Sequence, residues 1–140
     1  MKDYYTVFGR KIMGQCYLVE AKFIFKNDDP ASFCKVFKDT VERMNGVTAN
    51  FNLSYGDMDT PYGCFNILTG GQAYLGLDIQ GNEHPDIWRS VFDASYGWEW
   101  VMYDVFSAIL KECENGSKVK IWPDFGETTI TVKDCEVKIV

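Results

Sequence analysis

Apolar and polar residues alternate along two stretches of the chain, residues 15–26 and 47–55. The first stretch would place five apolar side chains on one face, from Tyr17 to Phe25, and Glu20 with two lysines on the other. The second stretch alternates without a break from Val47 to Tyr55. Successive side chains of a strand point to opposite faces, so both stretches are predicted to be strands with one buried face. Residues 4–8 are predicted to form an earlier strand.

A helical spacing of apolar residues marks two further segments. Asp28-Asp29-Pro30 is typical of a helix start, and Gly46 is expected to follow the helix end. Between them, apolar residues recur every three or four positions, at Phe33, Val36, Phe37, Val41 and Met44. Residues 85–114 predict a second helix with a bend at Gly97. Its two apolar stripes are Ile87, Trp88, Val91 and Phe92, then Trp98, Val101, Met102, Val105, Ile109 and Cys113.

Shorter apolar runs predict five more strands, at residues 64–69, 73–80, 119–122, 128–132 and 135–140. Gly70-Gly71 is expected to form a tight hairpin turn between the first two of these runs. The predicted order is two strands, a helix, three strands, a helix and three strands. We therefore expect one α+β domain over residues 1–140, built as a two-layer sandwich. A largely antiparallel sheet of about six to eight strands would be covered on one face by two amphipathic helices.

The charge of the chain is acidic and lies in its second half. The 140 residues hold 14 lysines and arginines against 20 acidic residues, a net charge of −6. Residues 1–70 carry 8 acids and 8 bases, so residues 71–140, with 12 acids and 6 bases, hold the whole excess. An acidic chain repels phosphate backbones, so direct binding to nucleic acid or to an anionic membrane is disfavoured. A partner protein with a basic surface is the favoured alternative.

The cysteines and the single histidine limit the chemistry. Five cysteines occur without a CxxC or other short metal-binding spacing, and His84 is the only imidazole. We expect a reducing, cytoplasmic setting with mostly buried thiols, and neither a metal site nor a cofactor. No apolar run is long enough to span a membrane, and the first residues have no apolar core of a secretory signal.

Three patterns suggest catalysis or metal binding, and each has a simpler interpretation. His84, between carboxylates, has the surroundings of a general base, but Glu83-His84-Pro85-Asp86 also resembles a helix start. Asp57 and Asp59 suit a hard cation, although ordinary turn chemistry explains them. Cys34 lies near lysines as a nucleophile requires, yet beside an apolar stripe that would bury it. A catalytic role is therefore disfavoured.

The predicted helix over residues 98–114 has aromatic residues on its polar face. Trp100 and Tyr103 lie there with Asp104, and exposed aromatic residues beside acids are typical of interface anchors. The alternative is that another part of the chain covers them. The loop before residue 64 is a second expected contact, since function concentrates in loops. The predicted partner-binding residues are Trp100, Tyr103, Asp104, Asp86, Asp93, Asp57, Asp59 and Tyr62.

These observations favour a small acidic cytoplasmic protein-binding module. Its size and charge resemble those of inhibitors, immunity proteins and phage or bacterial defence-related proteins that block a partner surface, which is an analogy of class. One alternative is a small-molecule-binding protein or enzyme with a polar and aromatic pocket between sheet and helices. Another is a self-associating structural subunit, a homo-oligomer formed by edge pairing of residues 135–140.

Overall fold

The computed structural model describes residues 14–77, 83–124 and 126–140, and the side chains of all of these except 74–77 and 83–86. The strands in these ranges are β1 (Gly14–Lys22), β2 (Ala73–Leu77), β3 (Glu83–Ser95), β4 (Lys118–Trp122), β5 (Thr128–Lys133) and β6 (Glu136–Ile139). The helices are α1 (Ala31–Met44), α2 (Pro61–Leu68) and α3 (Trp98–Leu110), with short 3-10 turns η1 (Lys26–Asp28) and η2 (Leu53–Tyr55).

The six strands form one sheet in the order β2-β3-β1-β4-β5-β6. Every neighbouring pair is antiparallel, which confirms the α+β class and the antiparallel sheet. β1 lies in the middle and pairs with β3 and β4, both distant in sequence. Its alternation is as predicted, because Tyr17, Val19 and Ala21 are buried on the face that meets the helices.

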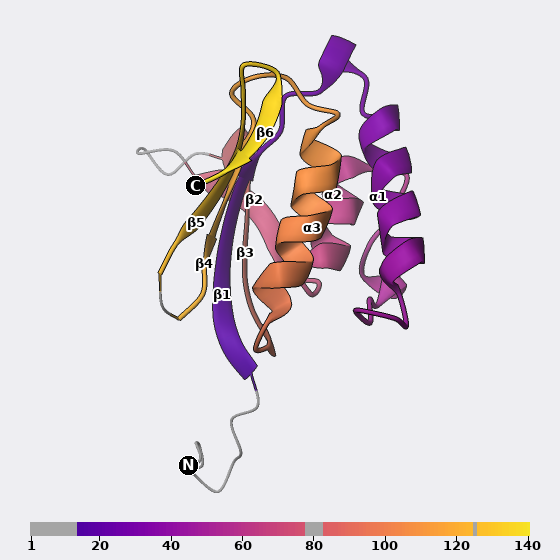
Figure 1. Ribbon diagram of the computed structural model, residues 1–140, viewed down its shortest axis with the longest axis vertical. Helices are drawn as coiled ribbons and strands as arrows, with labels where there is room; N and C mark the ends of the chain where they lie inside the picture. Colours follow the sequence, from indigo (N-terminus) through magenta and orange to yellow (C-terminus); the bar gives the residue numbers. More distant parts are fainter. Residues whose placement is uncertain (1–13, 78–82, 125) are drawn as a thin grey trace, which may run out of the picture.

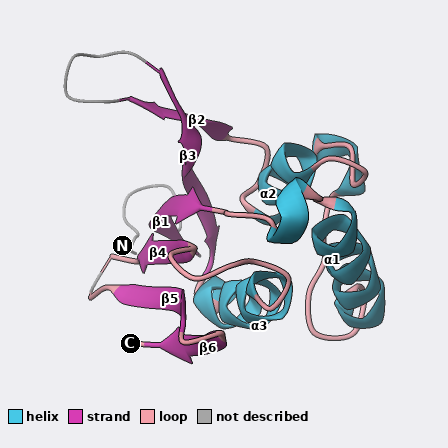
Figure 2. Cartoon of the chain, turned by 90° about the horizontal axis from the view of Figure 1, so that it is seen from above, coloured by secondary structure: helices cyan, strands magenta, loops and turns pink. Residues whose placement is uncertain are grey.

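The helices lie on one side of the sheet and are not arranged in a single layer. α3 packs on β4 and β5, and α2 packs beside β2, whereas α1 packs against α3 and α2 farther from the strands (Figures 1 and 2). The prediction of two covering helices was therefore incomplete. The core between the layers is apolar and includes Phe33, Phe37, Phe65, Phe106 and Ile121, each at most 1% exposed.

The other side of the sheet, called here the outer face, has no described helix against it (Figure 2). On β3 the inward side chains are Trp88, Ser90, Phe92 and Ala94, and the outward ones are Ile87, Arg89, Val91 and Asp93. The prediction that residues 85–95 form a helix was wrong. The stripe Ile87, Trp88, Val91, Phe92 suits either structure, and pairing with β1 along nine residues selects the strand.

The segment 47–55 is not a strand, although its alternation is regular. Val47 is 81% exposed, and only Ala49 and Phe51 are buried. Side-chain amides replace sheet partners here, because Asn45 Oδ1 accepts a hydrogen bond from Phe51 N at 3.0 Å and Asn52 caps η2. Alternation alone therefore does not make a strand when no neighbour is free to pair with it.

The predicted strand at residues 64–69 falls within α2. Pro61 occupies the first turn, and Thr60 Oγ1 accepts a hydrogen bond from Gly63 N at 3.1 Å. This is a typical helix N-cap. The apolar run that follows it suited a strand equally well, so the sequence did not reveal the helix. Gly70 and Gly71 do adopt positive φ, 73° and 81°, but they join α2 to β2 rather than two strands.

Several predicted elements agree with the structure. α1 buries the predicted stripe of Phe33, Phe37, Val41 and Met44, and β4, β5 and β6 match the three C-terminal strands. Gly97, with φ 92°, is the residue before α3 and separates it from β3. The predicted strand at residues 4–8 lies outside the described residues.

Candidate functional site

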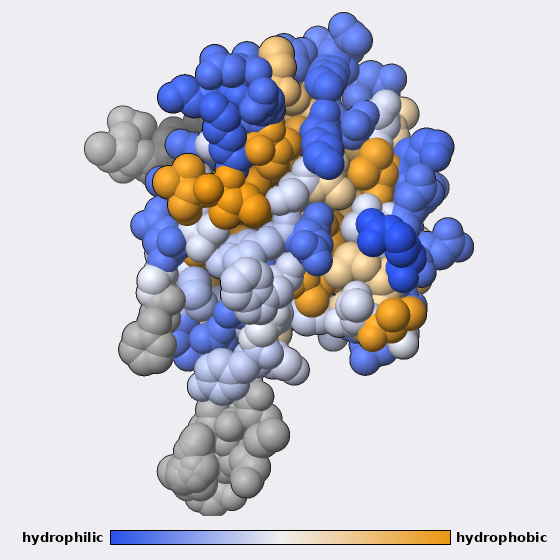
Figure 3. Space-filling view, in the orientation of Figure 1, coloured by the Kyte–Doolittle hydropathy of each residue, from blue (hydrophilic) through white to orange (hydrophobic). Residues whose placement is uncertain are grey.

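The N-terminal half of α3 presents exposed aromatic side chains. Trp100 is 67% exposed, and Tyr96, in the turn before the helix, is 63% exposed. Tyr103 is half-buried, and its ring meets that of Trp100 edge to face at 5.3 Å. Asp104 is exposed one turn after Trp100. We call Tyr96, Trp100, Tyr103 and Asp104 the α3 surface; in Figure 3, pale side chains of intermediate hydropathy gather over the lower part of α3.

The sequence around α3 explains why this side faces outward. Met102, Val105, Phe106, Ile109 and Leu110 fill the opposite side of the helix and are buried. At the first residue of the helix, the indole nitrogen of Trp98 donates a hydrogen bond to the Leu68 carbonyl at 3.3 Å. The Tyr103 hydroxyl is hydrogen-bonded to Thr128 Oγ1 at 2.8 Å. Trp100 therefore stands on a helix fixed to both α2 and β5.

A buried polar group ties the start of α3 to the sheet. The Tyr17 hydroxyl donates a hydrogen bond to Glu99 Oε1 at 2.7 Å and accepts one from Gln15 Nε2 at 2.6 Å. Burial raises the pKa of Tyr17 to about 12. The Glu99 carboxylate therefore holds the helix in place, a role that sequence reasoning missed because 82 residues separate it from Tyr17.

Two open grooves flank Trp98 beside the α3 surface. One, of about 330 Å³, runs between Asn52, Tyr55 and β3. The other, of about 310 Å³, lies between residues 48–50 and the β3–α3 turn, with Tyr96 and Val101 at its wall. Sequence reasoning did not find these grooves, because it placed residues 47–55 in the sheet.

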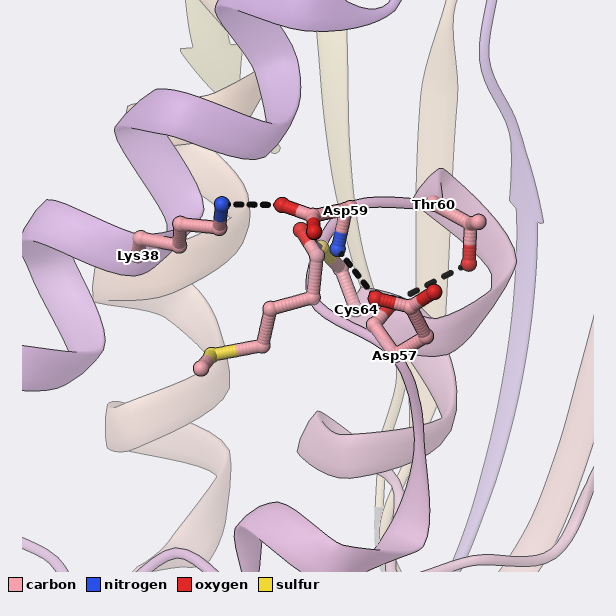
Figure 4. Close-up of polar contacts among 6 residues, drawn as sticks. Lys38, Asp57, Asp59, Thr60 and Cys64 are labelled. Atoms are coloured by element: carbon pink, nitrogen blue, oxygen red, sulfur yellow. Dashed lines mark hydrogen bonds and ion pairs between the residues drawn. The ribbon is translucent and has the colours of Figure 1, made fainter.

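The predicted contact loop makes its polar contacts elsewhere. Asp59 forms an ion pair with Lys38 of α1, and Asp57 Oδ1 accepts a hydrogen bond from Asp59 N at 2.8 Å (Figure 4). Tyr62 is half-buried, with its ring 5.5 Å from that of Trp88. The carboxylates thus brace the loop before α2, as turn chemistry predicts.

The remaining predicted site residues do not join the α3 surface. Asp93 is exposed on the outer face of β3, opposite Cys16 and on the far side of the sheet from α3. Asp86 and His84 lie in β3, and their side chains are outside the described ones. Of the predicted set, the structure brings together Trp100, Tyr103 and Asp104.

Three of the five cysteines are buried thiols, whereas Cys16 and Cys135 are exposed. Cys34 and Cys64 are buried beside each other, and desolvation is the main cause that raises the pKa of each thiol. Burial likewise raises the pKa of Cys113 to about 11. A reactive thiolate needs a lowered pKa, so these three are not activated nucleophiles. Among the described residues, no three histidine, cysteine or acidic side chains gather as a metal site would require.

Comparisons of the chain with known protein families, with curated sequences and with solved structures gave no significant match. Within the described ranges, no helix has both the length and the apolar character needed to cross a membrane.

Proposed function

We propose that this protein is a small binding module that docks on a basic surface of a partner protein through its α3 surface. The observation that carries the proposal is Trp100, 67% exposed on a helix whose other side is buried. Trp is the residue type most enriched among interface anchors, and a partner that covers the ring removes a large apolar area from water.

The neighbours of Trp100 suit such an anchor. Tyr103 supports the indole from one side, and its own hydroxyl is held by Thr128. A supported ring loses little side-chain entropy on binding, which favours affinity. Asp104 stands at the rim, where a charge affects the rate of association more than the final affinity. The overall charge of −6 adds to the attraction for a basic partner.

The specific form of this proposal is an inhibitor or immunity-type protein of the cytoplasm, which acts by covering a partner's surface. Neither catalysis nor a cofactor is required for that action. Size, acidity and the α3 surface support it. The partner is defined by its chemistry, a basic patch with a recess for an indole ring.

A capture experiment with three baits tests the proposal. The parent chain, Trp100→Ala and the matched control Ile139→Ala are immobilised and exposed to host lysate, and retained proteins are quantified. Ile139 is also apolar and exposed, at 56%, but lies on β6. We expect at least one basic protein to be retained by the parent and the control and lost from Trp100→Ala, by about tenfold or more, as for a binding hot spot. Equal retention by all three baits would contradict the proposal.

A small polar ligand in the grooves beside Trp98 is the second candidate. Asn50, Ser95 and Trp98 line both grooves. An amide and a hydroxyl beside an aromatic ring suit a small polar ligand. Native mass spectrometry of the freshly purified protein distinguishes the two functions. Extra mass that leaves on denaturation would favour the ligand, and a bare chain mass would favour the protein partner.

A further inference from the structure

The outer face of the sheet is ordered by charge along its strands. Aligned residues of β3, β1 and β4 form rows across it, because each pair of strands is in register. Toward the start of β1 is an acid end, with Asp93 opposite Cys16 and Asp124 just after β4. Next comes an apolar belt of Val91, Leu18 and Trp122. Beyond it is a basic end, with Glu20 between Arg89 and Lys120, and Lys22 opposite Lys118.

Two exposed carboxylates make the acid end. Asp93 and Asp124 act together on Cys16, whose thiol pKa is raised first by desolvation and then by these two charges. Both carboxylates therefore lie close to the same point of the sheet. The described residues show no ion pair for either of them within 4.0 Å.

The apolar belt is open to solvent. Val91 is 46% exposed, and Leu18 and Trp122 are partly exposed. The three side chains form one row over three adjacent strands, with no described helix above them. A contiguous apolar row rimmed by charges is typical of an interaction surface.

The basic end holds more cations than its carboxylate neutralises. Glu20 is bound by Arg89 at 2.8 Å, and in the described part of the chain Lys22, Lys118 and Lys120 have no ion pair. Like charges directly across a strand pair are destabilising, so Lys22 opposite Lys118 is costly in the isolated chain. The lysines rim a groove of about 240 Å³ that an incoming group can enter.

We propose that the outer face docks on the outer face of a second copy of this chain. A two-fold axis that lies between the two faces and runs along the belt, past Leu18, sets the acid end of each copy against the basic end of the other. The same patch then serves both copies, as a two-fold interface requires, and the two sheets pack face to face. A nucleic acid is a poorer occupant, because Asp93, Asp124 and Glu20 repel a polyanion that crosses the face.

The outer face is small for a protein–protein interface. Three strands about 4.8 Å apart and seven residues with a rise of about 3.3 Å give roughly 330 Å² per copy. That lies below the area of standard stable interfaces, so the dimer is reversible and forms as concentration rises. Because opposite charges meet at both ends, added salt weakens it.

Sedimentation velocity of the full chain over a concentration series tests the proposal. The acid-end variant Asp93→Lys/Asp124→Lys and the basic-end variant Lys118→Glu/Lys120→Glu are each measured alone and then mixed. Each variant alone has like charges at both ends, so we expect its dimer dissociation constant to rise about tenfold or more. The mixture restores opposite charges, and we expect a heterodimer near the parent affinity.

Two controls distinguish this dimer from other contacts. Lys35→Glu changes a charge on the exposed side of α1, away from the outer face. Ile139→Lys places a charge on β6 and disfavours edge pairing by that strand. Both variants are expected to dimerise as the parent does. A salt titration of the parent, which needs no variant, is expected to raise the dissociation constant.

Three results would overturn the proposal. The first is a parent chain that stays monomeric at every concentration. The second is a dimer whose dissociation constant is unchanged in the acid-end and basic-end variants, or a dimer that is lost in Ile139→Lys. The third is a monomer that binds a labelled single-stranded oligonucleotide and loses it in Lys118→Glu/Lys120→Glu, which would assign the basic end to polyanions.

Discussion

At the scale of single residues, the Tyr17 hydroxyl has the most consequential environment in the structure. It is fully buried, yet it connects Gln15 on β1 with Glu99 at the start of α3. Such a buried hydrogen bond stabilises the folded state chiefly because a buried polar group without a partner would lose its hydration and gain nothing in return. The Tyr17 hydroxyl therefore links the start of α3 to the sheet, in addition to the hydrogen bonds of Trp98 and Tyr103 and the buried side of the helix.

Replacement of Tyr17 by Phe is expected to lower the free energy of unfolding by about 1–3 kcal/mol, because Glu99 and Gln15 lose a buried partner. The pH profile provides a second readout. The folded-state pKa of Tyr17 is raised to about 12, from 10 in the unfolded chain, so its contribution is complete below pH 10 and is lost as the pH rises toward 12. Urea denaturation at several pH values would show this decline in the parent and a smaller one in Tyr17→Phe.

The exposed tyrosine Tyr96 offers the matched control, since its ring is 63% exposed. Tyr96→Phe should unfold at the same urea concentration as the parent. If Tyr17→Phe behaved in the same way, the hydroxyl network would have no structural role.

At the scale of elements, the sequence predicts those helices and strands whose type is decided by their own pattern of apolar residues. The predictions of α1 and of β1 up to Lys22 agree with the structure, because one face of each carries a continuous apolar pattern; beyond Lys22 the predicted strand gives way to η1. Residues 64–69 and 85–95 were assigned the wrong element type, because short apolar runs suit either a helix or a strand. Segment 47–55 alternates like a strand but has no partner, and pairing is a property of the whole sheet.

Within the candidate site, the residues that lie on one helix were predictable and those that lie on different elements were not. Trp100, Tyr103 and Asp104 lie on one helix, so their common face could be read from spacing. Asp57 was predicted as part of a second contact loop and Asp93 was added for its charge; the structure places Asp57 in a braced loop and Asp93 on the outer face. The grooves beside Trp98 were beyond prediction, since they depend on how residues 48–52 cross the end of the sheet.

The loop before α2 closes through a backbone approach that only glycine allows. A Cβ on Gly63 would lie 2.0 Å from the Asp57 carbonyl oxygen, closer than any real contact. Gly63→Ala is therefore expected to lower the free energy of unfolding by about 2 kcal/mol or more. Gly46→Ala is the control, because nothing lies within 4 Å of the new Cβ. The positive φ of residue 46, 79°, is expected to lower the free energy of unfolding by about 1 kcal/mol. Urea denaturation that gave equal losses would contradict the steric explanation.

At the scale of the whole molecule, the charges separate by surface. The net charge of −6 lies in residues 71–140 of the sequence, but in the fold the lysines of the outer face, from both halves of the chain, gather at one end of the sheet. Sequence arithmetic could not show this, because those lysines lie on β1 and β4, almost a hundred residues apart. The α3 surface and the outer face lie on opposite sides of the sheet, so one copy can use both.

The association rate of the captured partner tests the proposed function most directly. Stopped-flow mixing with the parent, Asp104→Lys and Glu42→Lys, at low and high salt, compares charge reversals on α3 and on the exposed side of α1. We expect Asp104→Lys to slow association about threefold to tenfold at low salt and to flatten its salt dependence, with Glu42→Lys close to the parent. Identical rates and salt dependence for the parent and Asp104→Lys would show that the partner does not approach through the α3 surface.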